Sequence, residues 1–183
     1  MKKIFTLTLT VVCLMIATFT VEAASSTSRQ IAVVIVGSAD YKTKDFIEYT
    51  NNFFKTTEKF EIVTGKAVQT KYQNYWLDKG LIDEGTPTKE DFVNFVNYAG
   101  YNKVVYLVIK DSVIDQHGSK KGKGRSRASL TINAFLVDKM QVIKVDSSTN
   151  EEDSKTSELR ARRGAFKQCV KEISENLNPL LLK

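Results

Sequence analysis

The sequence predicts a single three-layer α/β domain over residues 24–183, with a mixed sheet that has early parallel strands and a late antiparallel hairpin, and with helices on both faces. Two observations support this. The runs 30–37 and 103–110 are almost entirely β-branched or apolar, which is typical of strands buried on both faces. Residues 129–138 alternate between apolar and polar side chains, as expected for a strand with one covered face.

The first part of the domain is predicted to be a strand–helix–strand unit. A turn over residues 38–40 follows the strand at 30–37, and Thr43 is a suitable N-cap for a helix over residues 44–55. A short strand at 60–64 comes next. A right-handed crossover would make the two strands parallel neighbours.

Two helices are predicted to precede the next strand. The first, at 66–79, carries an aromatic stripe at helical spacing, made of Val68, Tyr72, Tyr75 and Trp76. The stripe indicates a half-buried helix face, and the alternative is a ligand-binding surface. Thr88 starts the second helix, with Asp91 three positions later in a box-like arrangement, and Gly100 ends it.

The second half of the chain is predicted to extend the sheet and close it with a helix. The strand at 129–138 turns back at 141–145 as a hairpin, and residues 146–153 are expected to form a polar, acidic loop. The last helix is predicted over 154–176, ended by Pro179. Its inner face repeats at i, i+3 and i+4 through Leu159, Arg162, Phe166, Cys169 or Val170, Ile173 and Leu177. Its cations are expected to form a solvated face, with a binding surface as the alternative: Arg160, Arg162, Arg163, Lys167 and Lys171.

Residues 1–23 have the features of a cleavable secretory signal peptide. Lys2 and Lys3 precede an uncharged apolar run over residues 4–20, and Val21-Glu22-Ala23 resembles a cleavage site. The alternatives are a retained anchor or lipidation at Cys13, which lies inside the apolar run rather than after it. We therefore expect an exported protein, periplasmic or extracellular, that is soluble after cleavage. Removal of the signal takes away two Lys and one Glu, so the net charge falls from +6 to +5.

Few residues in the mature chain suggest chemistry. Cys169 is its only cysteine, which excludes an intramolecular disulfide and indicates a small core residue. His117 is the only histidine and is expected in a loop, and Asp40 is expected to cap the turn after the first strand. No metal-ligand spacing, nucleophile elbow or glycine-rich phosphate loop is present in the sequence, so no catalytic residue, metal or cofactor is predicted. A small secreted hydrolase that uses Asp40 or His117 remains an alternative.

The segment 118–127 is the sharpest local feature of the chain. It places five cations among Gly and Ser residues: Lys120, Lys121, Lys123, Arg125 and Arg127. Such a loop suits an anionic polymer or lipid, and the alternative is a solvated hairpin tip. No aromatic side chain is interleaved with these cations, so the sequence does not support nucleic-acid binding by base stacking.

Several segments resemble a known group of envelope domains. They are the opening strand 31–36, the strand 60–63, the strand entry 100–109, the strand and return 130–145, and the start of the last helix at 161–166. In these segments, which span nearly the whole mature chain, the protein is similar to the TolB N-terminal domain, the curli-secretion lipoprotein and the penicillin-binding-protein activator lipoproteins. The chain departs from that group in having no lipidation motif after its apolar run and in its basic loop.

The resemblance implies an accessory role without catalytic residues or cofactors. We therefore expect an exported, non-enzymatic envelope accessory protein that docks to an envelope protein partner. The alternative is a surface polyanion-binding protein that uses the basic loop 118–127.

Overall fold

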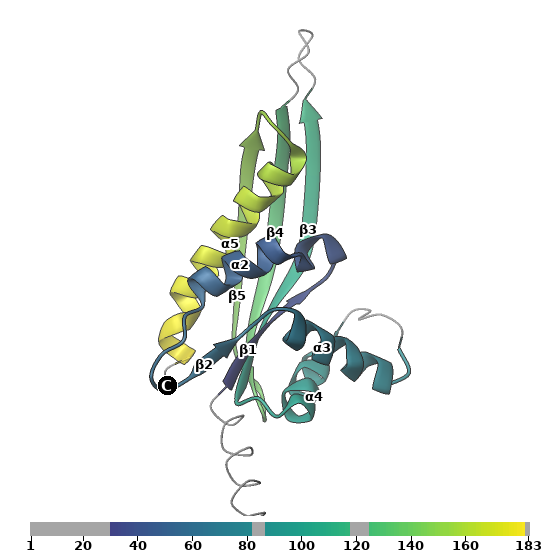
Figure 1. Cartoon of the computed structure of the whole chain (residues 1–183), viewed down its shortest axis with the longest axis vertical. Helices are drawn as coiled ribbons and strands as arrows, with labels where there is room; N and C mark the ends of the chain where they lie inside the picture. Colours follow the sequence, from purple (N-terminus) through teal and green to yellow (C-terminus); the bar gives the residue numbers. More distant parts are fainter. Residues whose placement is uncertain (1–29, 82–86, 118–124, 182–183) are drawn as a thin grey trace, which may run out of the picture.

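The computed structural model describes residues 30–81, 87–117 and 125–181, with the backbone alone for residues 111, 112 and 114–117. The described strands form one sheet in the order β2-β1-β3-β4-β5 (Figure 1). They are β1 (Gln30–Val36), β2 (Glu61–Val63), β3 (Lys103–His117), β4 (Arg125–Asp138) and β5 (Val142–Ser154). β1 runs parallel to β2 and β3, and β4 runs antiparallel to β3 and β5, which confirms the predicted mixed sheet.

Helices cover both faces of this sheet, as predicted. α2 (Lys44–Phe53) and α5 (Glu158–Leu181) pack on one face, and α3 (Lys66–Asp78) and α4 (Lys89–Ala99) pack on the other. A short 3-10 helix, η1 (Ala39–Lys42), joins β1 to α2. The predicted signal peptide at residues 1–23 lies outside the described residues.

β1 supplies side chains to both layers. Three of them, Ile31, Val33 and Ile35, lie in the core under α2 and α5, and the alternate three, Ala32, Val34 and Val36, lie in the core under α3 and α4. None of the six is more than 3% exposed. Full burial of a large aliphatic side chain stabilises a fold by roughly 1.5–3 kcal/mol, so this central strand holds both layers together.

The core under α2 and α5 contains a cluster of three aromatic rings. The ring of Phe46 meets those of Tyr41 and Phe166 edge-on, with centroids 5.1 and 4.9 Å apart respectively. Tyr41 and Phe166 stack at 6.0 Å. The cluster joins η1, α2 and α5, and Cys169 is buried one turn further along α5, as predicted.

The aromatic stripe of α3 is a buried helix face and not an open ligand surface. Val68, Tyr72, Tyr75 and Trp76 are all at most 4% exposed, and they pack against α4 and the sheet. The predicted helix start at Thr88 is confirmed as a capping box with Asp91, and Gly100 ends α4 with a left-handed φ of 75°.

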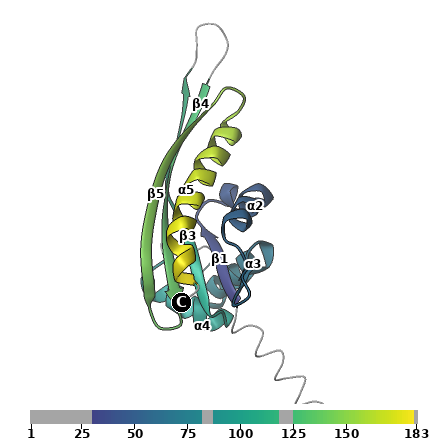
Figure 2. The same cartoon turned by 90° about the vertical axis from the view of Figure 1, so that its left-hand side faces the viewer.

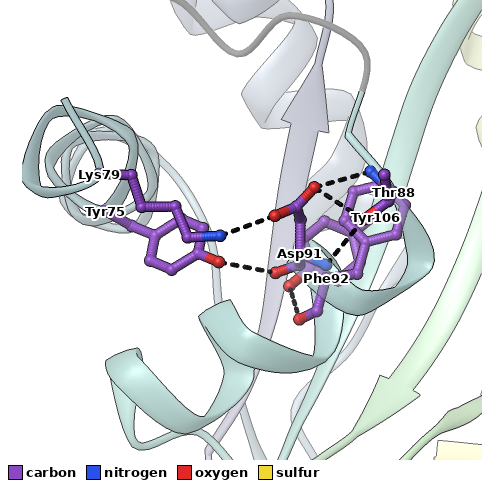
Figure 3. A network of polar contacts seen from close by, with 6 residues as sticks. All are labelled: Tyr75, Lys79, Thr88, Asp91, Phe92 and Tyr106. Atoms are coloured by element: carbon purple, nitrogen blue, oxygen red, sulfur yellow. Dashed lines mark hydrogen bonds and ion pairs between the residues drawn. The ribbon is translucent and has the colours of Figure 1, made fainter. Parts of the chain in front are cut away.

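A polar network joins α3 to α4 and to the sheet (Figure 3). Lys79 Nζ lies 2.7 Å from Asp91 Oδ1, and the Tyr75 hydroxyl donates to the Asp91 carbonyl at 3.3 Å. The buried Tyr106 hydroxyl on β3 donates to the Phe92 carbonyl at 2.7 Å. At the same helix start, the Asp91 N–H donates to Thr88 Oγ1 at 3.2 Å, which satisfies one of the N–H groups that the first turn of a helix leaves without a helical partner.

The last three strands are longer than the sequence predicts. β3 continues to His117 and β4 begins at Arg125, so His117 lies at the end of a strand and the prediction of a loop there was wrong. The predicted acidic loop at 146–153 is also wrong, because β5 continues through it to Ser154. Figure 2 shows these long strands with α5 along one side.

The last helix differs from its prediction at both ends. It starts at Glu158 and ends at Leu181, so Pro179 lies inside its last turn and does not end it. A proline there removes one backbone hydrogen bond, and burial of Leu177 and Leu181 on either side offsets that cost. Leu159, predicted on the inner face, is 47% exposed.

Candidate docking surface

The free edge of β5 is the most distinctive described surface of this protein. β5 pairs with β4 on one side and is the last strand of the sheet. From Lys144 to Ser154 each residue has a partner on β4 without interruption. On the N-terminal side of that stretch, Ile143 has no partner residue on β4, which marks a β-bulge. A long regular edge presents backbone N–H and C=O groups that another strand can pair with.

The two ends of this edge differ in character. Ile143 and Val145 are 40% and 48% exposed, so the N-terminal end of β5 presents apolar side chains to solvent. The C-terminal end of β5 is acidic, with Glu151, Glu152 and Asp153 all exposed. An apolar contact at one end of the edge and an anionic one at the other give a strand partner both affinity and register.

The side of β5 that faces α5 is held by polar contacts. Ser148 Oγ donates to Glu172 Oε2 at 2.5 Å, and Asn150 Nδ2 donates to the same oxygen at 3.0 Å. Further along, Asn176 Nδ2 donates to Asp146 Oδ2 at 2.9 Å. The strand is thus fixed by the helix behind it, while its outer edge stays accessible.

The close approach of α5 to β5 depends on Gly164. A side-chain carbon added at this position would collide with Cγ and Cδ of Glu152. Glycine lets the helix backbone lie directly over the strand at this point.

The opposite face of β4 and β5 carries cross-strand polar pairs. Thr131 Oγ1 and Thr149 Oγ1 lie 2.9 Å apart, and Ser147 Oγ donates to Asn133 Oδ1 at 2.8 Å. Such pairs stabilise a sheet face that faces water, which explains how a strand can form without an apolar pattern.

The predicted polyanion site lies at the far end of β4. Lys120, Lys121 and Lys123 are outside the described residues. Arg125 and Arg127 are on β4 and exposed. Arg127 Nε lies 2.8 Å from Asp153 Oδ1, and its NH1 lies 4.0 Å from Glu151 Oε2. Arg127 therefore lies beside two carboxylates of β5, which lower the positive potential an anionic polymer would meet.

The two catalytic candidates are far apart in the fold. Asp40 lies in η1, where its Oδ2 accepts a hydrogen bond from Arg162 NH1 at 3.0 Å. Ser38 caps η1 by accepting from the Asp40 N–H at 3.4 Å, so Asp40 is not the residue that caps this turn. His117 ends β3 on the long hairpin, and the structure describes its backbone only.

The predicted solvated charged face of α5 is found for Arg160, Lys167 and Lys171, which are exposed, but the prediction was wrong for Arg162 and Arg163. Arg162 is 21% exposed and also pairs with Glu158 at 2.7 Å, while Arg163 pairs with Asp45 of α2. Burial lowers the pKa of Arg162, but the Asp40 hydrogen bond and the Glu158 charge outweigh it and raise that pKa above its ordinary value. These ion pairs fasten α5 to η1 and α2.

Across residues 30–81, 87–117 and 125–181, no three His, Cys, Asp or Glu side chains gather in a way that would hold a metal ion. Within the same ranges, every helix is too short or too polar to cross a bilayer.

The chain is similar to several solved structures. It covers 99% of the lipoprotein GNA1162 from Neisseria meningitidis with 84% of its own length, at 13% identity and a TM-score of 0.48. For the hypothetical protein CT253 from Chlamydia trachomatis it covers 96% with 80% of its own length, at 9% identity and a TM-score of 0.43. For the LpoB C-terminal domain from Escherichia coli it covers 84% with 68% of its own length, at 14% identity and a TM-score of 0.36.

Lipoproteins are among these matches. No protein-family profile matches the chain, and no curated protein matches its sequence. Because each of these TM-scores lies below 0.5, the function proposed below is based on the chain's own residues.

Proposed function

We propose that this protein is an exported, non-enzymatic accessory protein of the cell envelope that docks to a partner protein along β5. The observation behind this proposal is the long regular edge of β5, with Ile143 and Val145 exposed at one end and an acidic group at the other. The partner adds an extended segment to this edge, with main-chain hydrogen bonds for affinity. Cationic side chains on that segment would face Glu151 to Asp153.

Export and the absence of catalysis are parts of the same proposal. The predicted signal peptide at residues 1–23 supports export. The ion pair of Asp40 with Arg162 supports a structural role for that carboxylate, since it fastens α5 to η1. The hydrolase alternative would instead require a hydrolytic activity that is lost in D40N or H117A.

Site-specific photo-crosslinking in living cells tests the docking edge. A photoreactive amino acid is placed at Val145 or Thr149 on β5, and at Glu48 on α2 as a control that is also exposed. We expect one discrete crosslinked product from both β5 positions and none from position 48. The variant V145K should abolish the product formed at position 149, because a charge on an edge strand opposes strand addition. Equal crosslinking from all three positions, or none from β5, would refute the proposal.

A second proposal retains the polyanion site at Lys120, Lys121, Lys123, Arg125 and Arg127. It is supported by the exposure of Arg125 and Arg127 at the described end of β4. Binding to purified lipopolysaccharide should weaken steeply with salt, because counterions are released on binding. Replacement of all five cations by Gln should remove this binding and leave crosslinking from β5 intact. Salt-independent binding, or binding retained in the variant, would contradict this second proposal.

A further inference from the structure

A pocket of about 450 Å³ opens where the end of α2, the strand β2 and the last turns of α5 meet. Its apolar lining comes from four separate parts of the chain: Ile31, Phe53, Phe60, Ile62 and Leu181. Phe53, Phe60 and Ile62 are only half-buried, so their apolar surface faces the pocket's open space. The volume lies within the range of about 300–1,000 Å³ that small-molecule sites occupy.

Hydrogen bonds hold the walls of this pocket in place. In the segment between α2 and β2, the Thr57 N–H donates to the Phe60 carbonyl at 2.9 Å and the Ile62 N–H donates to Thr56 Oγ1 at 3.0 Å. On the α5 side, Asn178 Nδ2 donates to the Phe53 carbonyl at 3.1 Å. The pocket is therefore preformed, which lowers the entropic cost of binding a ligand.

Cations dominate the mouth of the pocket. Lys55 and Lys171 both line it with exposed side chains, and neither ammonium lies within 4.0 Å of a carboxylate among the described residues. Lys103 lies behind the ring of Phe60, with its Nζ 5.8 Å from the ring centroid. Among the described residues of the lining, Glu175 is the one acidic residue. An anionic group at the mouth would thus meet two ammonium groups, neither of which forms an ion pair with a carboxylate of the described residues.

We propose that this pocket binds a single acyl chain that carries an anionic head group. The chain would lie against Phe53, Phe60 and Ile62, and the head group would lie between Lys55 and Lys171. A free fatty acid has this chemistry, and an anionic phospholipid offers it when one of its two acyl chains enters the pocket. The site is separate from β5, so it does not depend on the docking proposal.

Calorimetric titration with decanoate tests the proposal directly. We expect saturable binding of one decanoate per chain, weaker by at least about tenfold in K55Q/K171Q, a loss that corresponds to about 1.4 kcal/mol. The control K66Q/K89Q removes the same charge from exposed positions on α3 and α4, across the sheet, and should bind as the unaltered protein does. The neutral analogue 1-decanol should bind more weakly than decanoate to the unaltered protein. Circular dichroism spectra confirm that each variant is folded.

A second arm distinguishes the source of the ligand. Vesicles of phosphatidylglycerol and of phosphatidylcholine are incubated with the protein and separated by flotation. Capture by phosphatidylglycerol alone, lost in K55Q/K171Q and retained in the five-cation loop variant, would identify a bilayer lipid as the source. Decanoate binding without vesicle capture would identify a free fatty acid. Failure of decanoate and of vesicles to bind, or equal binding by K55Q/K171Q, would overturn the proposal without affecting the crosslinking result for β5.

Discussion

The ammonium group of Lys79 lies 2.7 Å from a carboxylate oxygen of Asp91 and joins the end of α3 to the start of α4 (Figure 3). The same carboxylate accepts hydrogen bonds from the backbone N–H and the hydroxyl of Thr88, at 2.9 and 2.8 Å. The Lys79 ammonium also lies over the ring of Tyr75, 4.8 Å from its centroid. One carboxylate therefore both caps α4 and anchors α3.

This arrangement predicts a pH dependence of stability. Burial raises the pKa of Asp91, but hydrogen bonds from Lys79 and Thr88 outweigh it and hold that pKa below its ordinary value of 3.8. A carboxyl group whose pKa falls on folding stabilises the protein at pH values above its pKa in the unfolded chain. This stabilisation is lost as the pH falls through the lower pKa of the folded protein. The Asp91 hydrogen bond raises the pKa of Lys79 from 10.5 to about 12. The stabilisation that the Lys79 ammonium gives is therefore fully present below pH 10.5 and is lost as the pH rises through about 12.

We expect D91N to lower the free energy of unfolding at neutral pH by about 1 kcal/mol, since the side chains of the ion pair are 36% and 20% exposed. The difference from the unaltered protein should shrink as pH is lowered from about 5 to about 2. Urea unfolding across this range measures it. A deficit that does not change with pH would mean that the carboxylate charge contributes nothing.

Substitution of Gly164 should show coupling to Glu152. Gly to Ala in a helix interior normally stabilises by up to about 1 kcal/mol. Here the new methyl group would meet the Glu152 side chain, so G164A should give no gain or a loss. In an E152A background the same change should recover the gain. A double-mutant cycle from urea unfolding measures the coupling, and additive effects would refute the contact.

Cys169 should be unreactive in the folded protein. Burial raises the pKa of its thiol, although hydrogen bonds with Ser148 and Asn150 partly oppose this shift. The thiol also donates to the Leu130 carbonyl at 3.4 Å. In protein without residues 1–23, a disulfide reagent should label this thiol in urea but only very slowly in buffer at pH 8. Rapid labelling of the folded protein would show that α5 lifts readily from the sheet.

Removal of the Phe166 ring should cost far more than removal of a neighbouring surface side chain. F166A leaves a cavity beside Tyr41 and Phe46, so we expect a loss of roughly 3–5 kcal/mol in the free energy of unfolding. L159A, on the exposed side of the same helix, should change it by less than about 0.5 kcal/mol. Comparable losses from both variants would contradict the orientation of α5 in this fold.

The elements predicted well are those with strong local signals. The two β-branched runs became the adjacent central strands β1 and β3, because a strand buried on both faces needs apolar side chains at every position. Thr88, Asp91 and Gly100 marked the ends of α4, because caps depend on particular side chains near in sequence.

β5 could not be predicted beyond residue 145 because its inward positions are polar. Ser148 and Asn150 face α5, where apolar residues would be expected, and they bond to Glu172 instead. Hydropathy cannot detect such a pairing, since the partner lies on another element. Cross-strand pairs such as Thr131 with Thr149 stabilise the other face in the same way.

Most of the candidate sites could not be predicted from the sequence, for a related reason. The apolar pocket combines residues from β1, α2, β2 and α5, so no local motif marks it. The docking edge is a property of strand order, which follows from the position of β5 outside β4. The charges of Arg162 and Arg163 were visible, but their partners Asp40 and Asp45 are distant in sequence.

The central position of β1 has a consequence for how the chain folds. This strand is synthesised first, yet its neighbour β3 pairs with it only when residues from Lys103 to Val108 are available. Until then the segment from Ile31 to Val36 is an uncharged, proline-free, β-branched stretch of the kind that associates with copies of itself. Pairing between segments so distant in sequence is slow to form. Fragments that end before β3 should therefore aggregate rather than fold.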